Sequence, residues 1–239
     1  MLAQYRLFNQ SLASLDVGKT LITTLNAHCH NMAQTDKGYR EVLLNSDVLI
    51  PDGVSIVKAV KWLTGKQLTK IAGADLFFYE MERLQKTGRK CFFLGSSEST
   101  LEKIKERANR EYHDIEVRTY SPPYKPKFTA EENAAILASI NAFQPDVLMV
   151  GMTAPKQEKW AYQHYTQLEV GHICCIGAVF DFYAGTIKRA PKWMIKLGLE
   201  WLYRLIKEPR RMWRRYLIGN TKFIWYVVKE KFALLTSNN

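Results

Sequence analysis

The sequence predicts an α/β fold, a mostly parallel sheet with helices on both faces, followed by a basic helical C-terminal appendage. Two observations predict it. Short apolar runs alternate with amphipathic stretches over residues 1–187, which is the pattern of a parallel sheet covered by helices. Residues 188–239 then carry thirteen Lys/Arg against three Glu, net +10, so residues 1–187 contribute only +1 to the total of +11. We therefore expect an α/β domain over 1–187 and an appendage over 188–239.

Six apolar runs are candidate strands, and each has a plausible helix before or after it. They are Thr20–Leu25, Asp47–Ile50, Lys90–Leu94, Ile115–Tyr120, Asp146–Val150 and His172–Ile176. After the third run, a glycine-serine turn begins at Gly95 and leads into Ser99–Tyr112, whose apolar residues recur at helical spacing. A strand, a glycine turn and a helix form the unit of a doubly wound, Rossmann-like sheet.

A proline-rich stretch at residues 121–126 interrupts this pattern. Its prolines cannot pair inside a sheet or continue a helix, so we expect a surface loop. The loop leads to Thr129, which forms a capping box with Glu132 and begins the helix Ala130–Phe143. Because strands and helices resume after it, this loop is a connection within one domain.

The tail, residues 188–239, interleaves its basic residues with four of the six tryptophans. It indicates two or three helices, one of which ends near Glu208-Pro209 because proline disfavours helical geometry before it. This composition is typical of a segment that meets an anionic surface with an apolar layer beneath. No stretch approaches the roughly 18–20 apolar residues of a membrane span, and no secretory signal opens the chain, so we expect a cytoplasmic protein.

The four cysteines lack C-x-x-C spacing and lie in or near apolar runs, which indicates reduced core residues. The triplet His28-Cys29-His30 is the one candidate metal site. Adjacent side chains point to different sides of a helix or strand, however, and no second ligand cluster accompanies the triplet. We therefore expect no metal ligand and no cofactor.

Candidate functional residues are those that follow the strands, because ligands of open α/β sheets bind beyond the carboxyl ends of the strands. The candidates for substrate binding are Thr24, Asn26, Gly95, Gly151, Gln157 and Asp181. Thr24 and Asn26 could equally be a strand end followed by a helix cap. The sequence contains no G-x-G-x-x-G and no P-loop, which disfavours dinucleotide-dependent dehydrogenases and P-loop NTPases.

Asp52 stands out among these residues, since it directly follows a buried strand and precedes the helix Val54–Leu63. One interpretation is that Asp52 only caps that helix. The other is that it accepts a proton, and we expect a low pKa for it because the helix dipole favours the charged form.

A D-x-D pair, the usual arrangement for holding a divalent cation against a nucleotide diphosphate, is also missing from the sequence. If a diphosphate leaves in the reaction, cationic side chains must stabilise it, and the arginine fork binds phosphate oxygens well. Arg211 and Arg214 in the tail would lie one helical turn apart on one face.

Several motifs, in order along nearly the whole chain, resemble those of the TagA/WecG/CpsF family of bacterial glycosyltransferases. They are Thr24-x-Asn26, Pro51-Asp52-Gly53, Gly73-x-Asp75-Leu76, Gly151-x-x-x-Pro155-Lys156-Gln157-Glu158 and Gly177-Ala178-x-Phe180-Asp181-x-x-Ala184-Gly185. The tail from Arg189 to Arg211 is similar to the carboxyl-terminal appendage of that family.

The resemblance implies an inverting, metal-independent enzyme that moves an N-acetylmannosamine-type sugar, either N-acetylmannosamine or its uronic acid, from a UDP donor to polyprenyl-diphosphate-linked N-acetylglucosamine in cell-surface polysaccharide synthesis. It implies Asp52 as the base and Thr24, Asn26 and Gln157 as sugar-site residues. The appendage would complete the active site at the inner face of the bacterial cell membrane. By spacing, the arginines at the diphosphate would be Arg204, Arg211 and Arg214, with Arg210 and Arg215 able to substitute.

Three other functions stay open at this point. The donor could be another UDP-hexose such as UDP-glucose. A nucleic-acid-binding or RNA-modifying protein would also combine basic and aromatic residues, but the basic residues are confined to the tail and the body has no recognition motif. A membrane-bound scaffold without activity is the third. We expect no nucleic acid partner, and self-association as a homo-oligomer if the apolar tail surface is exposed off the membrane.

Overall fold

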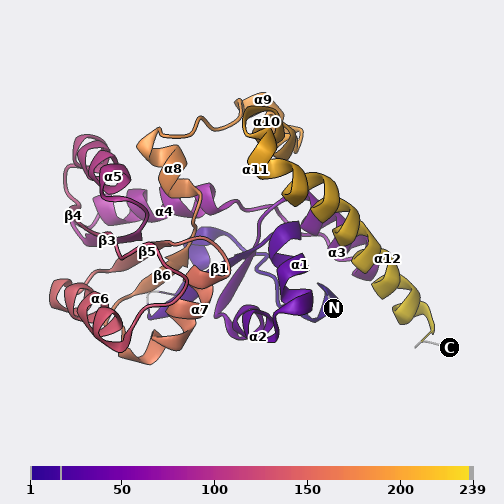
Figure 1. Ribbon diagram of the computed structural model, residues 1–239, viewed down its shortest axis with the longest axis horizontal. Coiled ribbons are helices and arrows are strands. Elements are labelled where there is room, and N and C mark those ends of the chain that lie inside the picture. Colours follow the sequence, from indigo (N-terminus) through magenta and orange to yellow (C-terminus); the bar gives the residue numbers. More distant parts are fainter. Residues whose placement is uncertain (1, 17, 237–239) are drawn as a thin grey trace.

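A six-stranded parallel sheet forms the centre of the computed structural model, which describes residues 2–16 and 18–236 (Figure 1). The strand order is β2-β1-β6-β5-β3-β4, and each pairing between neighbours is parallel. The strands are β1 (Thr20–Leu25), β2 (Val48–Pro51), β3 (Lys90–Gly95), β4 (Glu116–Tyr120), β5 (Val147–Gly151) and β6 (His172–Cys175). The predicted α/β class is confirmed, and each predicted strand is present to within one residue at either end.

Helices surround this sheet and continue into the tail. Those of the body are α1 (Ala27–Thr35), α2 (Lys37–Asn45), α3 (Val54–Thr64), α4 (Gly73–Gln85), α5 (Glu98–Glu111), α6 (Ala130–Phe143), α7 (Lys156–Gln163) and α8 (Val179–Ala184). Short 3-10 turns are η1 (Leu2–Gln4), η2 (Leu12–Ser14) and η3 (Tyr165–Gln167). The predicted capping box is confirmed, because Thr129 Oγ1 accepts from Glu132 N at 3.3 Å while the Glu132 carboxylate accepts from Thr129 N at 2.7 Å.

The tail forms three helical stretches, which agrees with the two or three predicted. They are α9 (Lys192–Lys196), α10 (Glu200–Lys207) and a long run made of α11 (Pro209–Trp213), the π-helical turn η4 (Arg214–Ile218) and α12 (Gly219–Thr236). The helix α10 ends just before Glu208-Pro209, as predicted, and Pro209 then begins the next helix.

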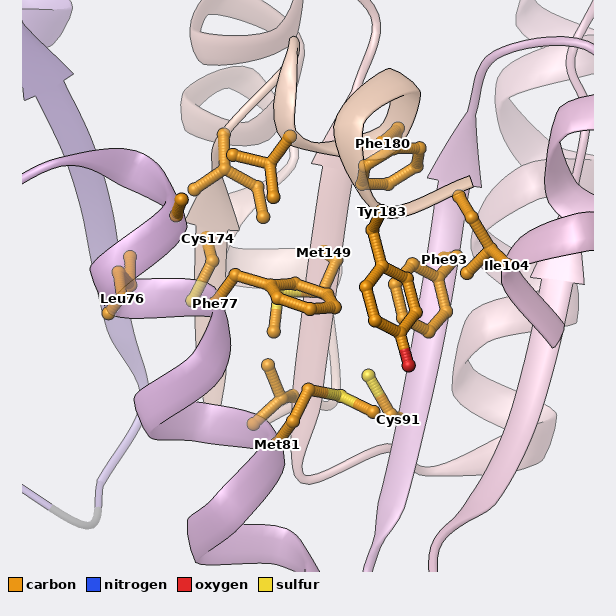
Figure 2. Close-up of a cluster of buried hydrophobic side chains, with 14 of the residues drawn as sticks. Leu76, Phe77, Met81, Cys91, Phe93, Ile104, Met149, Cys174, Phe180 and Tyr183 are labelled. Carbon is orange, nitrogen blue, oxygen red and sulfur yellow. The ribbon is translucent and has the colours of Figure 1, made fainter. Parts of the chain in front are cut away.

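Side chains of successive strand residues enter cores on opposite faces of the sheet, as the two-residue period of a strand requires. Phe93 of β3 packs with α4, α5 and α8, whereas its neighbours Phe92 and Leu94 pack with α6 and α7. Figure 2 shows the first of these cores, in which the rings of Phe77 and Tyr183 lie 4.6 Å apart between centroids.

The predicted burial of the cysteines is confirmed. Cys91 and Cys174 lie in this same core, and all four cysteines are free and buried (Figure 2). Burial raises the pKa of each thiol, to about 11 for Cys29, so these residues behave as small apolar side chains.

The last helix, α12, packs on the body rather than extending away from it. It lies along α1 and also contacts α3 (Figure 1). Phe223 and Val227 are buried in a third apolar cluster with Leu25 of β1. Close to the end of α12, the buried Glu230 carboxylate accepts hydrogen bonds from the backbone N–H groups of Leu2 at 2.6 Å and Ala3 at 2.8 Å. The tail and the body are therefore joined by apolar packing and by a hydrogen-bonded clamp.

Candidate active site

The candidate residues line one side of the sheet, where the carboxyl ends of the strands meet, and we call this side the carboxyl edge. Asp52 follows β2, Asn26 follows β1, and Gly177 comes just after β6. Gly151 and Gly95 end the next strands, β5 and β3. In strand order these positions follow one another without a gap, as expected for ligand-binding residues of a doubly wound sheet.

Close backbone packing explains why two of these positions are glycines. A Cβ atom added to Gly95 would lie 2.6 Å from the carbonyl oxygen of Gly151. One added to Gly151 would lie 2.6 Å from the ring of Phe180, the residue before Asp181. The glycines therefore allow β3, β5 and α8 to meet at the carboxyl edge.

Asp52 and Asn26 are held side by side at the ends of β2 and β1. The Asp52 N–H donates to the carbonyl of Leu25 at 2.9 Å, which continues the pairing of the two strands. Asn26 caps α1, since its Oδ1 accepts from the Cys29 N–H at 3.0 Å, and its side chain also hydrogen-bonds to the Asp52 carboxylate. Asp52 itself is not a helix cap, because Gly53 occupies the N-cap of α3 and no side chain caps that helix. Its carboxylate is thus left for another role.

The expected low pKa of Asp52 is wrong. Burial raises its pKa to about 6, with a further increase from Glu200 of the tail, whereas Lys70, the hydrogen bond from Asn26, and Arg215 act in the opposite direction. Desolvation by burial outweighs the favourable charges, so the carboxyl does not have the low pKa of a solvated helix cap. A carboxylate with this pKa is ionised at neutral pH and basic enough to serve as a general base.

The tail arginines lie in different environments. Arg204 is buried with its guanidinium 5.5 Å from the ring centre of Phe182 in α8. Arg211 is paired with Glu208 at 2.7 Å and its side chain is 56% exposed. Arg214 is exposed and stacks on Trp213 at 5.2 Å. Of the three predicted arginines, the structure therefore brings Arg204 against the body and leaves the other two at the surface.

Arg215 is the tail arginine whose charge reaches the carboxyl edge. Besides acting on Asp52, it contributes, after burial, to lowering the pKa of His28 to about 4. Its Nε is buried and has no hydrogen-bond partner within residues 2–16 and 18–236. An arginine nitrogen in this state can donate to an anionic ligand.

The π-helical turn η4 changes which residues of this helix share a face. Prediction from a regular 3.6-residue period places Arg211 and Arg214 on one face, but a π turn breaks that period. The turn is tied to the body at its end, where Asn31 Nδ2 of α1 donates to the Gly219 carbonyl at 2.7 Å. π turns are frequent at functional sites, yet the sequence gives no signal for this one.

The remaining candidates are placed as follows. Thr24 is buried in β1 opposite Ile50 of β2. Asp181 lies in the first turn of α8, where its carboxylate accepts from Thr186 Oγ1 at 3.4 Å and its carbonyl from the Ile187 N–H at 3.2 Å. Asp181 thereby closes the turn that leads into the tail. Within the part of the chain that the structure describes, no three His, Cys, Asp or Glu side chains are grouped as a metal site would require.

Comparison with known proteins identifies this arrangement. The model of the Glycosyl transferase WecG/TagA/CpsF family matches residues 4–237, which covers both the sheet and the tail. The chain belongs to this family. A WecG/TagA/CpsF glycosyltransferase is what the motifs at the carboxyl edge predict, and the family assignment is confirmed.

Curated relatives agree with the family match. The N-acetylglucosaminyldiphosphoundecaprenol N-acetyl-beta-D-mannosaminyltransferase of Bacillus spizizenii is 31% identical over 221 residues, covering 92% of this chain and 83% of the relative. Proteins of the same name from Bacillus subtilis and Staphylococcus aureus are 29% and 28% identical, covering 88% and 92% of this chain and 80% and 84% of their own lengths. Within the WecG/TagA/CpsF family, this chain is therefore similar to mannosaminyltransferases over most of its length.

Proposed function

We propose that this WecG/TagA/CpsF glycosyltransferase moves an N-acetylmannosamine-type sugar from a UDP donor to a polyprenyl-diphosphate-linked N-acetylglucosamine. The names of the relatives support this sugar and this acceptor. The observation that carries the proposal is Asp52 at the carboxyl edge, fixed by Asn26 and free of any capping role. Its placement fits a base that acts on an acceptor hydroxyl.

The proposed sugar transfer needs a general base at the acceptor and cationic side chains at the leaving diphosphate. Asp52 takes the proton of the acceptor hydroxyl while the oxygen attacks the anomeric carbon from the side opposite UDP, which inverts that centre. The bond from the anomeric carbon to the diphosphate oxygen breaks, and UDP leaves with the bonding electrons. We propose that Arg204 and Arg215 donate to the departing diphosphate, which is supported by their Nε atoms being buried without partners within the described residues. Arg211 and Arg214 stay candidates for the same task if the tail moves on binding.

We propose that Thr24, Asn26 and Gln157 contact the sugar, and that Gly95, Gly151 and Asp181 shape the substrate site. Thr24, Asn26 and Gln157 lie on the neighbouring elements β1, α1 and α7. The two glycines support this by letting β3, β5 and α8 pack closely where Asp181 begins α8.

We further propose that the tail docks on the inner face of the bacterial cell membrane. No helix in residues 2–16 and 18–236 is both long and apolar enough to cross a bilayer. Large apolar side chains are nevertheless exposed along the tail, among basic residues that suit anionic head groups. They are Trp193, Leu197, Trp201, Ile206, Trp213, Leu217, Ile218, Ile224, Trp225, Val228, Phe232 and Leu235. So many exposed apolar side chains fit a lipid surface better than a phosphate backbone, and self-association is the other way to cover them.

A donor panel tests the proposed transfer. UDP-N-acetylmannosamine, its uronic acid and UDP-glucose would each be offered with a polyprenyl-diphosphate N-acetylglucosamine analogue on anionic vesicles, with and without EDTA. We expect turnover with an N-acetylmannosamine-type donor, an inverted product, and no loss in EDTA. Turnover with UDP-glucose alone would identify glucose as the transferred sugar. Salt-dependent RNA binding without liposome binding would overturn the transferase proposal.

A further inference from the structure

Gln157 and Glu158 form a buried pair of polar side chains at the start of α7, beside the carboxyl edge. Gln157 is 4% exposed and Glu158 1% exposed. Gln157 Nε2 donates to Glu158 Oε1 at 2.9 Å. A Cβ atom added to Gly177, which follows β6, would lie 3.1 Å from Gln157 Oε1 and 3.5 Å from its Nε2, so the oxygen is the nearer end of the amide. The Gln157 amide therefore lies between a carboxylate on one side and the loop after β6 on the other.

The carboxylate decides which end of the amide faces which neighbour. An ionised carboxylate only accepts hydrogen bonds, so the NH₂ end of Gln157 must turn toward Glu158 and the oxygen toward Gly177. That oxygen is buried and has no donor within the described part of the chain. A buried carbonyl oxygen without a donor has an open place for an N–H or O–H group.

Glu158 is an unusual choice of partner, because only hydrogen bonds from the Gln157 amide and from its own backbone favour its charge. The titratable groups facing it are Tyr39 of α2, Cys29 of α1 and Cys175 of β6, none of which is cationic at neutral pH. The nearest ion pair on α7, Lys159 with Asp36 at 2.5 Å, is partly exposed. Burial raises the pKa of Glu158 to about 7, while the Gln157 hydrogen bond acts in the opposite direction. A glutamine at this position would avoid that desolvation, but because its amide both donates and accepts, it could pair with either end of Gln157 and would not fix the orientation.

We propose that Glu158 is a positioning residue that fixes the Gln157 amide with its oxygen toward Gly177, where it accepts a hydrogen bond from a hydroxyl or N–H group of the bound donor sugar. The orientation of the amide is a property of the protein alone, and its use on a sugar rests on the proposed function. Contact with the sugar requires the loop at Gly177 to shift, since the oxygen is buried in the ligand-free chain.

The first test needs no activity. The side-chain NH₂ signals of Gln157, assigned by their loss in Gln157→Glu, would be followed by ¹H–¹⁵N NMR from pH 5 to 9. We expect them to titrate near pH 7 in the wild type and to stay constant in Glu158→Gln. Gln157 NH₂ signals with the same chemical shifts in the wild type and in Glu158→Gln at every pH would overturn the proposal.

The second test separates positioning from a purely structural role. Glu158→Gln removes a buried charge, so we expect the Tm at pH 8 to rise while the KM for the donor increases roughly 3- to 10-fold, the loss of one oriented hydrogen bond, and kcat changes less. A structural role alone would change Tm without changing the KM. Glu80→Gln is the matched control, since Glu80 is equally buried but bonds to His172 at 2.7 Å near the amino ends of the strands, and we expect it to change Tm only.

The two tests distinguish the possible failures. NMR titration of Gln157 together with no transfer by the wild type would overturn the proposed function and leave the orientation of the amide standing. Transfer by the wild type together with an unchanged donor KM in Glu158→Gln would overturn the positioning role.

Discussion

Among single residues, Asp52 is governed by the balance between burial and the charges around it. A pKa of about 6 means that the carboxyl is protonated, and unable to accept a proton, below that pH. We therefore expect kcat/KM for the acceptor to rise between pH 5 and 7 and then level off. Asp52→Asn should lower transfer on the order of 100-fold or more while leaving UDP binding intact, as measured by calorimetry. Undiminished transfer by this variant would remove Asp52 from the mechanism.

Arg215 should act on the same titration. Its positive charge lowers the pKa of Asp52, so Arg215→Ala should raise that pKa and move the midpoint of the pH–rate profile to higher pH. Arg214→Ala is the matched control, because Arg214 is exposed on Trp213 and does not contribute to that pKa. Equal midpoints in all three proteins would show that the tail does not approach Asp52 in solution.

Prediction from sequence found the position of Asp52 but not its chemistry. The position follows from a local rule, since Asp52 comes directly after an apolar strand. Its pKa depends on burial and on charges that include Glu200 and Arg215, more than 140 residues further along the chain. The environment of Arg215 is likewise hidden from the sequence, because a π turn cannot be read from spacing that assumes a regular helix.

At the scale of secondary structure elements, local sequence signals were sufficient to predict the strands and the helix caps. They did not predict how elements far apart in the sequence pack together. The strands and the capping box of α6 follow from apolar runs, turn residues and a four-residue pattern. The docking of α12 was not predicted, because Phe223 and Val227 stand among equally apolar residues such as Ile224 and Trp225 that stay exposed. Which of them are buried is decided by the packing of α12 on α1 and α3.

The clamp between α12 and η1 gives a prediction for stability. Glu230→Ala would leave the backbone N–H groups of Leu2 and Ala3 without their acceptor, at about 1–3 kcal/mol for each group that stays buried. We expect the free energy of unfolding in urea to fall by that order. Lys229→Ala, an exposed change on the same helix, should stay within about 0.5 kcal/mol of the wild type. Equal stability of the two variants would mean that the clamp opens in solution.

Deleting residues 188–239 tests the proposed division of the chain into an α/β domain and a C-terminal appendage. The deletion should abolish transfer and liposome binding. It also removes Phe223 and Val227 from their cluster, so we expect the remaining domain to fold with a lower Tm than the full chain, as measured by calorimetry. Full activity of the shortened protein would refute an active site completed by the tail.

On the scale of the whole molecule, the exposed aromatic residues of α12 should decide membrane binding. Replacing Trp225 and Phe232 by Ser removes apolar side chains that are 56% and 65% exposed, so the fold should persist while sedimentation with anionic liposomes is lost. Tyr124→Ser is the control, because Tyr124 is fully exposed on the loop between β4 and α6, far along the chain from the tail. If the double variant sediments as well as the wild type, another surface binds the lipid.

The strand order also has a consequence for synthesis of the protein. The sheet is completed by β6, which lies between β1 and β5 although it is the last strand to be made. At about 5–20 residues per second, roughly 7–30 s separate the emergence of β1 from that of β6. During this interval the two-stranded β2-β1 and the three-stranded β4-β3-β5 can form, with the edges of β1 and β5 that later pair with β6 still open. We therefore expect the nascent chain to depend on chaperones that cover sheet edges until β6 closes the gap.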